Sequence, residues 1–111
     1  IFNECIKHED FVNIIQSEAY TAYYTDVDGN SQEVLFTPTN LYAQGEVDVP
    51  ENVTIVCGKT GTTDEAGYCL ILMEKDSSDN PYISIVMGAS EKPVLYEDMT
   101  SLIEAIPSGQ Q

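Results

Sequence analysis

The sequence of 111 residues predicts a small α+β domain, in which an antiparallel sheet carries a C-terminal helix on one face and is preceded by an N-terminal helix and a β-hairpin. Three observations predict this class. Three apolar runs are joined by short turns, a stripe with helical spacing lies near the C-terminus, and a Tyr- and Thr-rich segment leads into an Asp-Gly turn. Apolar residues make up 42% of the chain, which is enough for a packed core. We expect residues 1–107 to form the domain and 108–111 to form a polar tail.

The expected elements follow one another with short connections. In chain order they are a helix end at 1–7, a short helix around 11–15, strands at 19–25 and 32–36, a loop over 37–51, strands at 53–59, 68–73 and 82–87, and a helix at 92–106. The last three strands are joined by turns at 61–65 and 76–81, which are too short for a crossover, so their order is antiparallel. Because the amphipathic pattern at 1–7 has no cap before it, we expect the chain to begin inside a helix.

The strand at 68–73 is apolar at every position, which indicates a sheet covered on both faces. The terminal helix is expected to cover one of them. Its predicted buried face comprises Tyr96, Met99, Leu102, Ile103 and Ile106. The first helix is too short to cover the second face fully. We therefore expect that face to meet something outside these 111 residues.

The charge balance excludes several classes of partner. Nineteen acidic residues face four lysines and no arginine, and the net charge is -15. Such a surface repels nucleic-acid phosphates and anionic lipid head groups, so we expect no nucleic-acid partner. The acidic stretch at 26–30 resembles the start of a calcium loop, but Thr37 stands where the closing Glu would be needed. A hairpin turn is favoured there, and no metal or cofactor is expected.

The three cysteines, Cys5, Cys57 and Cys69, have no metal-binding spacing. Cys57 and Cys69 could lie opposite each other across a hairpin centred near Thr63. Direct cross-strand disulfides are uncommon, so buried free thiols are expected.

The run from Val56 to Leu70 contains Lys59-Thr60-Gly61-Thr62-Thr63 at the end of a predicted strand. A lysine there provides a positive field for a carboxylate, and the neighbouring threonine offers a hydroxyl donor. A glycine lets a ligand approach the backbone closely. The amide of Thr62 can then point at a developing oxyanion, an interaction that stabilises a transition state by roughly 3–4 kcal/mol.

This run resembles the serine D-alanyl-D-alanine carboxypeptidases, the low-molecular-mass penicillin-binding proteins, for which Lys-Thr-Gly is a known signature. The segments at 11–15, 39–41 and 83–89 and the terminal helix are also similar to parts of that family. The resemblance implies the C-terminal part of a β-lactamase/penicillin-binding transpeptidase fold. The stretch at 66–70 favours the carboxypeptidases over a β-lactamase-related hydrolase, which remains an alternative.

The resemblance also implies roles for individual residues. Lys59, Thr60 and Gly61 would flank the terminal carboxylate of a peptidoglycan stem peptide ending in D-Ala-D-Ala, and Thr62 would supply one oxyanion-hole amide. Thr63 is a further substrate-binding candidate. β-Lactams would acylate the same serine in the full-length enzyme, and the parent protein would act outside the cytoplasmic membrane.

The family's nucleophile motif, Ser-x-x-Lys, is absent, because no serine in the chain has a lysine three residues later. The second motif, Ser-x-Asn, occurs only at 78–80, after the Lys-Thr-Gly run rather than before it, and is interpreted as a turn. We expect both motifs to lie upstream of Ile1, in the missing N-terminal part of the domain, and the chain alone to be inactive. The alternatives are a non-catalytic binding or regulatory module that retains a Lys-Thr-Gly half-site, and a chance motif in an unrelated α+β domain.

Overall fold

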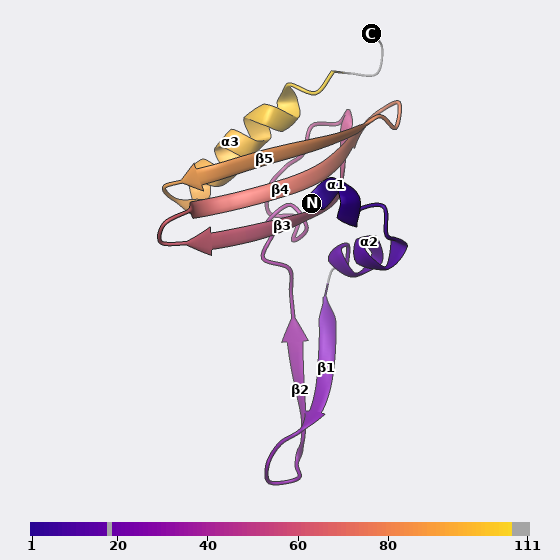
Figure 1. The fold of residues 1–111 in the computed structure, drawn as a ribbon, viewed down its shortest axis with the longest axis vertical. Coiled ribbons are helices and arrows are strands. Elements are labelled where there is room, and N and C mark those ends of the chain that lie inside the picture. Colours follow the sequence, from indigo (N-terminus) through magenta and orange to yellow (C-terminus); the bar gives the residue numbers. More distant parts are fainter. Residues whose placement is uncertain (18, 108–111) are drawn as a thin grey trace.

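The computed structural model describes residues 1–17 and 19–107, so the expected polar tail at 108–111 lies outside the described residues. The elements are α1 (Phe2–Cys5), α2 (Glu9–Ile15), β1 (Tyr20–Thr25), β2 (Ser31–Phe36), β3 (Val53–Thr63), β4 (Gly67–Asp76), β5 (Pro81–Ala89) and α3 (Lys92–Glu104). Figure 1 shows a sheet of β3, β4 and β5 with α3 against it and a projecting β1–β2 hairpin. The predicted α+β class is confirmed. No helix in the described part of the chain is long and apolar enough to cross a membrane.

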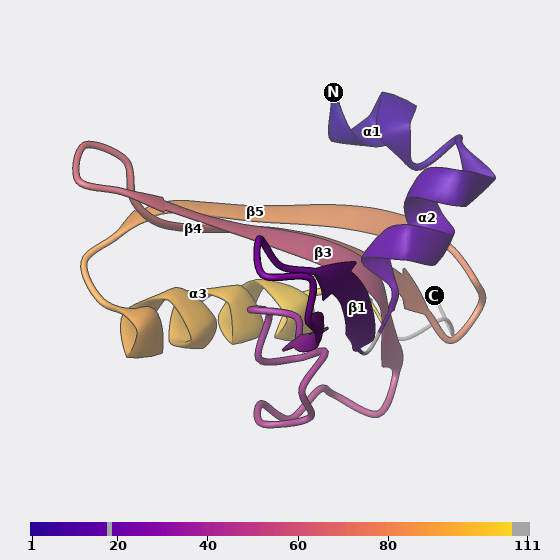
Figure 2. The ribbon, with the colours of Figure 1, turned by 90° about the horizontal axis from the view of Figure 1, so that it is seen from below.

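The two faces of β4 are covered unequally. Leu70 and Leu72 are almost completely buried against α3, which lies along one side of the sheet (Figure 2). Side chains alternate between faces along a strand, so Ile71 points to the other side, where it lies opposite Ile85 of β5. Ile85 is 53% exposed. The strand's continuous apolar run therefore reflects one covered face and one open apolar face.

The open face is partly shielded at one end only. Helix α2 lies on the side of the sheet opposite α3 and contacts β3 (Figure 2). At the far edge, Ile83, Ile85 and Met87 of β5 are 39%, 53% and 72% exposed. Within the described residues nothing covers them, in agreement with the expectation that two short helices cannot cover both faces.

Helix α3 ends at Glu104, two residues earlier than predicted, and its buried face differs from the prediction at two positions, since Leu95 is buried and Leu102 is not. Leu95, Tyr96, Met99 and Ile103 are buried, whereas Leu102 is 43% exposed. The buried residues follow the i, i+4 row that starts at Leu95. Leu102 lies one position before that row, at the margin of the stripe, which explains its exposure.

The hairpin of β1 and β2 is held by its turn. The Asp26 carboxylate accepts backbone hydrogen bonds from Asp28 and Asn30, both at 3.0 Å, and Gly29 adopts a φ of +83°. These bonds, chiefly that from Asn30, lower the pKa of Asp26. The predicted hairpin turn is confirmed. Residues 1–17 and 19–107 contain no group of three or more His, Cys, Asp or Glu side chains that could hold a metal ion.

Strand β3 is longer than predicted. It continues through Gly61 to Thr63, and the turn to β4 occupies residues 64–66 instead of 61–65. The prediction took Gly61 as a turn signal, but the positive φ that the turn requires belongs to Gly67, at +70°. The run Lys59–Thr63 therefore lies within the strand.

The longer strand also changes which residues lie opposite Cys57 and Cys69 in the sheet. Cys57 lies opposite Met73, and Cys69 lies opposite Gly61, so the two thiols are not cross-strand neighbours. All three cysteines are free, as expected, although only Cys57 is fully buried.

Candidate functional site

The Lys59–Thr63 run lies on an edge strand. β3 pairs with β4 on one side, and no described strand pairs with its other side. Lys59, Gly61, Thr62 and Thr63 are exposed, and Thr60 is half-buried. The structure therefore places all five predicted site residues along one accessible edge.

Two side chains bind backbone carbonyls of β3. The Lys59 amino group donates to the Thr60 carbonyl at 2.6 Å, and the side chain of Gln16, which follows α2, donates to the Val56 carbonyl at 3.0 Å. In an antiparallel pair, a residue's N–H and C=O either both face the partner strand or both point away, and the two cases alternate along the strand. The register shifts at Val56 and is regular from Cys57 to Thr63, and the bond from Lys59 fits a Thr60 carbonyl that points away from β4. By this alternation, the N–H of Thr62 also points to the free edge.

Lys59 and Thr60 approach this edge from opposite faces of the sheet. Lys59 lies opposite Ile71 and so belongs to the open face, whereas Thr60 lies opposite Leu70 and belongs to the α3 face. The Thr60 hydroxyl is hydrogen-bonded to the hydroxyl of Thr39. A ligand that lies along the edge, in the plane of the sheet, would have the ammonium on one side and the paired hydroxyls on the other.

The loop that carries Thr39 is fixed by α3. The Tyr96 hydroxyl accepts a hydrogen bond from the Leu41 backbone at 3.1 Å, and the Tyr42 hydroxyl is bonded to that of Thr100 at 2.7 Å. The two tyrosine rings pack with centroids 5.5 Å apart. The position of Thr39 beside β3 therefore depends on the packing of the terminal helix.

The two glycines of this part of β3 differ in whether the packing requires them. A Cβ at Gly58 would lie 2.4 Å from Leu72 Cδ2 and 2.9 Å from the Ile71 carbonyl oxygen, so close packing with β4 requires glycine there. A Cβ at Gly61 would meet nothing within 4 Å, and its φ lies outside the left-handed region. Neither packing nor backbone conformation therefore requires a glycine at position 61.

Thr63 has a role in the turn. Its hydroxyl accepts a hydrogen bond from the Ala66 backbone at 2.9 Å, which holds residues 64–66 in place. The fold therefore explains a hydroxyl at position 63. No comparable bond involves the Thr62 side chain in the described structure.

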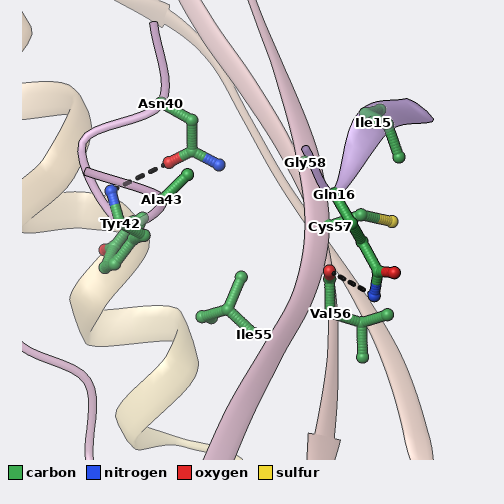
Figure 3. A pocket seen from close by; sticks show the side chains of 9 residues that line it. All are labelled: Ile15, Gln16, Asn40, Tyr42, Ala43, Ile55, Val56, Cys57 and Gly58. Atoms are coloured by element: carbon green, nitrogen blue, oxygen red, sulfur yellow. Dashed lines mark hydrogen bonds between the residues drawn. The ribbon is translucent and has the colours of Figure 1, made fainter. Parts of the chain in front are cut away.

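A cavity of about 150 Å³ lies beside β3, upstream of the Lys59–Thr63 run. Figure 3 shows Ile15 of α2 and the following Gln16 on one side of the strand and Asn40, Tyr42 and Ala43 on the other. Sequence reasoning did not find this cavity, because it joins segments that lie far apart in the chain.

Cys57 also lines this cavity. Burial raises its pKa, which favours the thiol over the nucleophilic thiolate. Cys57 therefore has the properties of a structural thiol.

The Ser78-Asp79-Asn80 sequence lies in the turn between β4 and β5, as predicted. Asp76 accepts backbone hydrogen bonds from Ser78 and Asn80, both at 2.9 Å, and Asp79 adopts a φ of +64°. This geometry is typical of an Asx turn. The register places the turn at the end of β4 opposite Val53, ten residues along β3 from Thr63.

A solved structure, the R248L mutant of the Streptomyces K15 DD-transpeptidase, is similar to this chain with a TM-score of 0.72. The two sequences are 23% identical, and the match covers 89% of this chain and 36% of that one. The likeness confirms the predicted fold, and the chain spans about a third of the length of the transpeptidase. No protein-family model and no curated protein matches the sequence.

Proposed function

We propose that the chain is part of the catalytic domain of a serine D-alanyl-D-alanine carboxypeptidase, a penicillin-binding protein of the cell envelope. In this proposal the free edge of β3 binds the C-terminal end of a peptidoglycan stem peptide. Lys59 and Thr60 attract the terminal carboxylate, Gly61 leaves room for the peptide, and Thr62 N–H binds the oxyanion. β-Lactams would bind at the same edge.

The observation that carries the proposal is the free edge itself, found in a fold similar to that of a DD-transpeptidase. Four residues of this edge carry the ammonium group of Lys59, the unobstructed Gly61 and the outward N–H of Thr62. A preorganised donor aimed at an oxyanion contributes about 10²–10³ in kcat. The serine that attacks the peptide carbonyl must come from polypeptide outside these 111 residues, because they contain no Ser-x-x-Lys.

The test is an assay of D-Ala release from a D-Ala-D-Ala peptide, with the 111-residue chain and with the protein encoded by its complete reading frame. We expect no release and no labelling by a fluorescent penicillin with the chain alone, and both with the complete protein. In the complete protein, Lys59→Ala should lower kcat/KM at least tenfold, since it removes the charge that faces the carboxylate.

Lys75→Ala is the matched control. Lys75 lies on the same face of the sheet as Lys59, but it lies opposite Thr54, away from the Lys59–Thr63 run. We expect it to change kcat/KM less than twofold. Equal effects of the two substitutions, or D-Ala release by the chain alone, would contradict the assigned roles.

The absence of Ser-x-x-Lys favours a second candidate, a non-catalytic module that binds the same peptide end. In that case a D-Ala-D-Ala peptide should shift the backbone amide resonances of residues 59–62 in the isolated chain, and the complete reading frame should encode no nucleophile. A Ser-x-x-Lys and a Ser-x-Asn upstream of Ile1 would exclude this candidate.

A further inference from the structure

The interface between the sheet and α3 contains an acidic side chain among apolar ones. Glu74 of β4 has an exposed fraction of 0% and lies on the same face as Leu70 and Leu72. Its neighbours in the register are Ile55 of β3 and Tyr82 of β5. A carboxylate in such a position loses its hydration. This desolvation is unfavourable in free energy unless hydrogen bonds or opposite charges replace the water.

Hydrogen bonding replaces only part of that hydration. One carboxyl oxygen of Glu74 accepts a hydrogen bond from the Ser84 hydroxyl, and the other is buried without any hydrogen-bond partner in the described structure. A neutral carboxyl group needs fewer partners than a carboxylate.

The titratable groups that face Glu74 supply no positive charge. β5 contributes Tyr82, β4 itself contributes Asp76, and α3 and the loop before β3 contribute Tyr96 and Tyr42. Burial chiefly raises the pKa of Tyr42, and interactions with Tyr96 and Glu74 add to the effect.

The four lysines lie elsewhere. Lys75 follows Glu74 directly and so points to the opposite face, Lys59 also lies on that face, and Lys7 is paired with Glu4 in α1. Lys92, at the start of α3, lines a cavity at the other end of the sheet with Thr62 and Tyr68.

We propose that Glu74 is protonated in the folded chain and that its ionisation loosens α3 from the β3–β4–β5 sheet, so that the packing of this helix responds to pH. Burial raises the pKa of Glu74 above its ordinary value of 4.5, and the bond from Ser84 opposes the rise only in part. The folded state thus holds the proton more tightly than the unfolded state. The contribution of Glu74 to stability is therefore fully present at pH values below 4.5 and is lost as the pH rises from there through the folded pKa.

The test compares urea unfolding of the unmodified chain with Glu74→Gln, which keeps the shape and cannot ionise, between pH 4.5 and pH 8. Because a group whose pKa is raised in the folded state destabilises that state as it ionises, we expect the ratio of the two constants to change more than twofold in favour of the variant. Glu104→Gln, an exposed site on α3, is the control and should change that ratio less than twofold. A ratio for Glu74→Gln that is constant over this range would overturn the proposal.

Two measurements on the unmodified chain remain decisive if Glu74→Gln does not fold. Carbon NMR of the glutamate carboxyl groups should show one resonance that titrates well above the others, and titration of all of them near 4.5 would refute a buried proton. Hydrogen exchange, corrected for its intrinsic pH dependence, should show protection of the Met99 and Ile103 amides falling as the pH rises. Unchanged protection would refute the loosening of α3.

Discussion

The two glycines of β3 give the most direct test of how the strand is packed. Gly58→Ala places a methyl group 2.4 Å from Leu72 Cδ2, 2.8 Å from Asn40 Nδ2 and 2.9 Å from the Ile71 carbonyl oxygen. The last of these atoms belongs to the backbone of β4 and cannot rotate away. Overpacking of this kind destabilises a protein by about 1–3 kcal/mol. Gly61→Ala meets nothing within 4 Å, and replacing a strand glycine by alanine stabilises by roughly 0.5–1 kcal/mol.

Both variants gain the same stabilisation from replacing a strand glycine, so this gain cancels when they are compared. Their free energies of unfolding should therefore differ by the overpacking cost alone, about 1–3 kcal/mol. Urea unfolding followed by far-ultraviolet circular dichroism measures this difference, since the chain has no tryptophan to report by fluorescence. We expect Gly58→Ala to unfold at lower urea and Gly61→Ala at the same or higher urea than the unmodified chain. A destabilised Gly61→Ala, or a Gly58→Ala that is as stable as Gly61→Ala, would refute the assigned packing of the strand.

Three further predictions concern the packing, the loop contacts and the turns of the fold. Leu72→Ala removes a completely buried side chain between the sheet and α3 and should lower the free energy of unfolding by about 2–5 kcal/mol, measured by urea unfolding. Tyr42→Phe removes the bond to the Thr100 hydroxyl and should lower it by about 0.5–1.5 kcal/mol; an unchanged value would mean that this bond does not hold the loop. The pKa of Asp76 is lowered, chiefly by the Asn80 side chain, so its stabilisation is present above its ordinary pKa of 3.8 and is lost as the pH falls through the folded pKa. Thermal unfolding of Asp76→Asn should show less loss of stability below pH 4 than the unmodified chain.

The sequence predicts the order of strands and the terminal helix because these depend on local patterns. The run at 68–73 is long and apolar, and the turns on either side are too short for any arrangement other than antiparallel. The predicted end of β3 was wrong, and the reason is also local. Gly61 inside a strand and Gly67 in a turn look alike in a single sequence, and only their φ angles separate them.

The supports of the site could not be predicted, because they join distant segments. Gln16 binds Val56 across 40 residues, and Thr39 binds Thr60 across 21. No spacing rule connects such pairs. The burial of Glu74 could not be predicted for the same reason. A Glu that ends an apolar run suggests exposure in the sequence, and only the strand register and the position of α3 place it in the core.

The fold explains most residues around the Lys59–Thr63 run, and the exceptions point to a ligand. Gly58 is required by packing, and the Thr63 hydroxyl is used by the turn. Lys59 and Gly61 have no such explanation. In a chain with nineteen acidic residues, the Lys59 ammonium forms no ion pair with any described carboxylate and instead binds a backbone carbonyl at the free edge. Under the proposed function, the group that meets this charge, two residues before the open glycine, is the terminal carboxylate of the peptide.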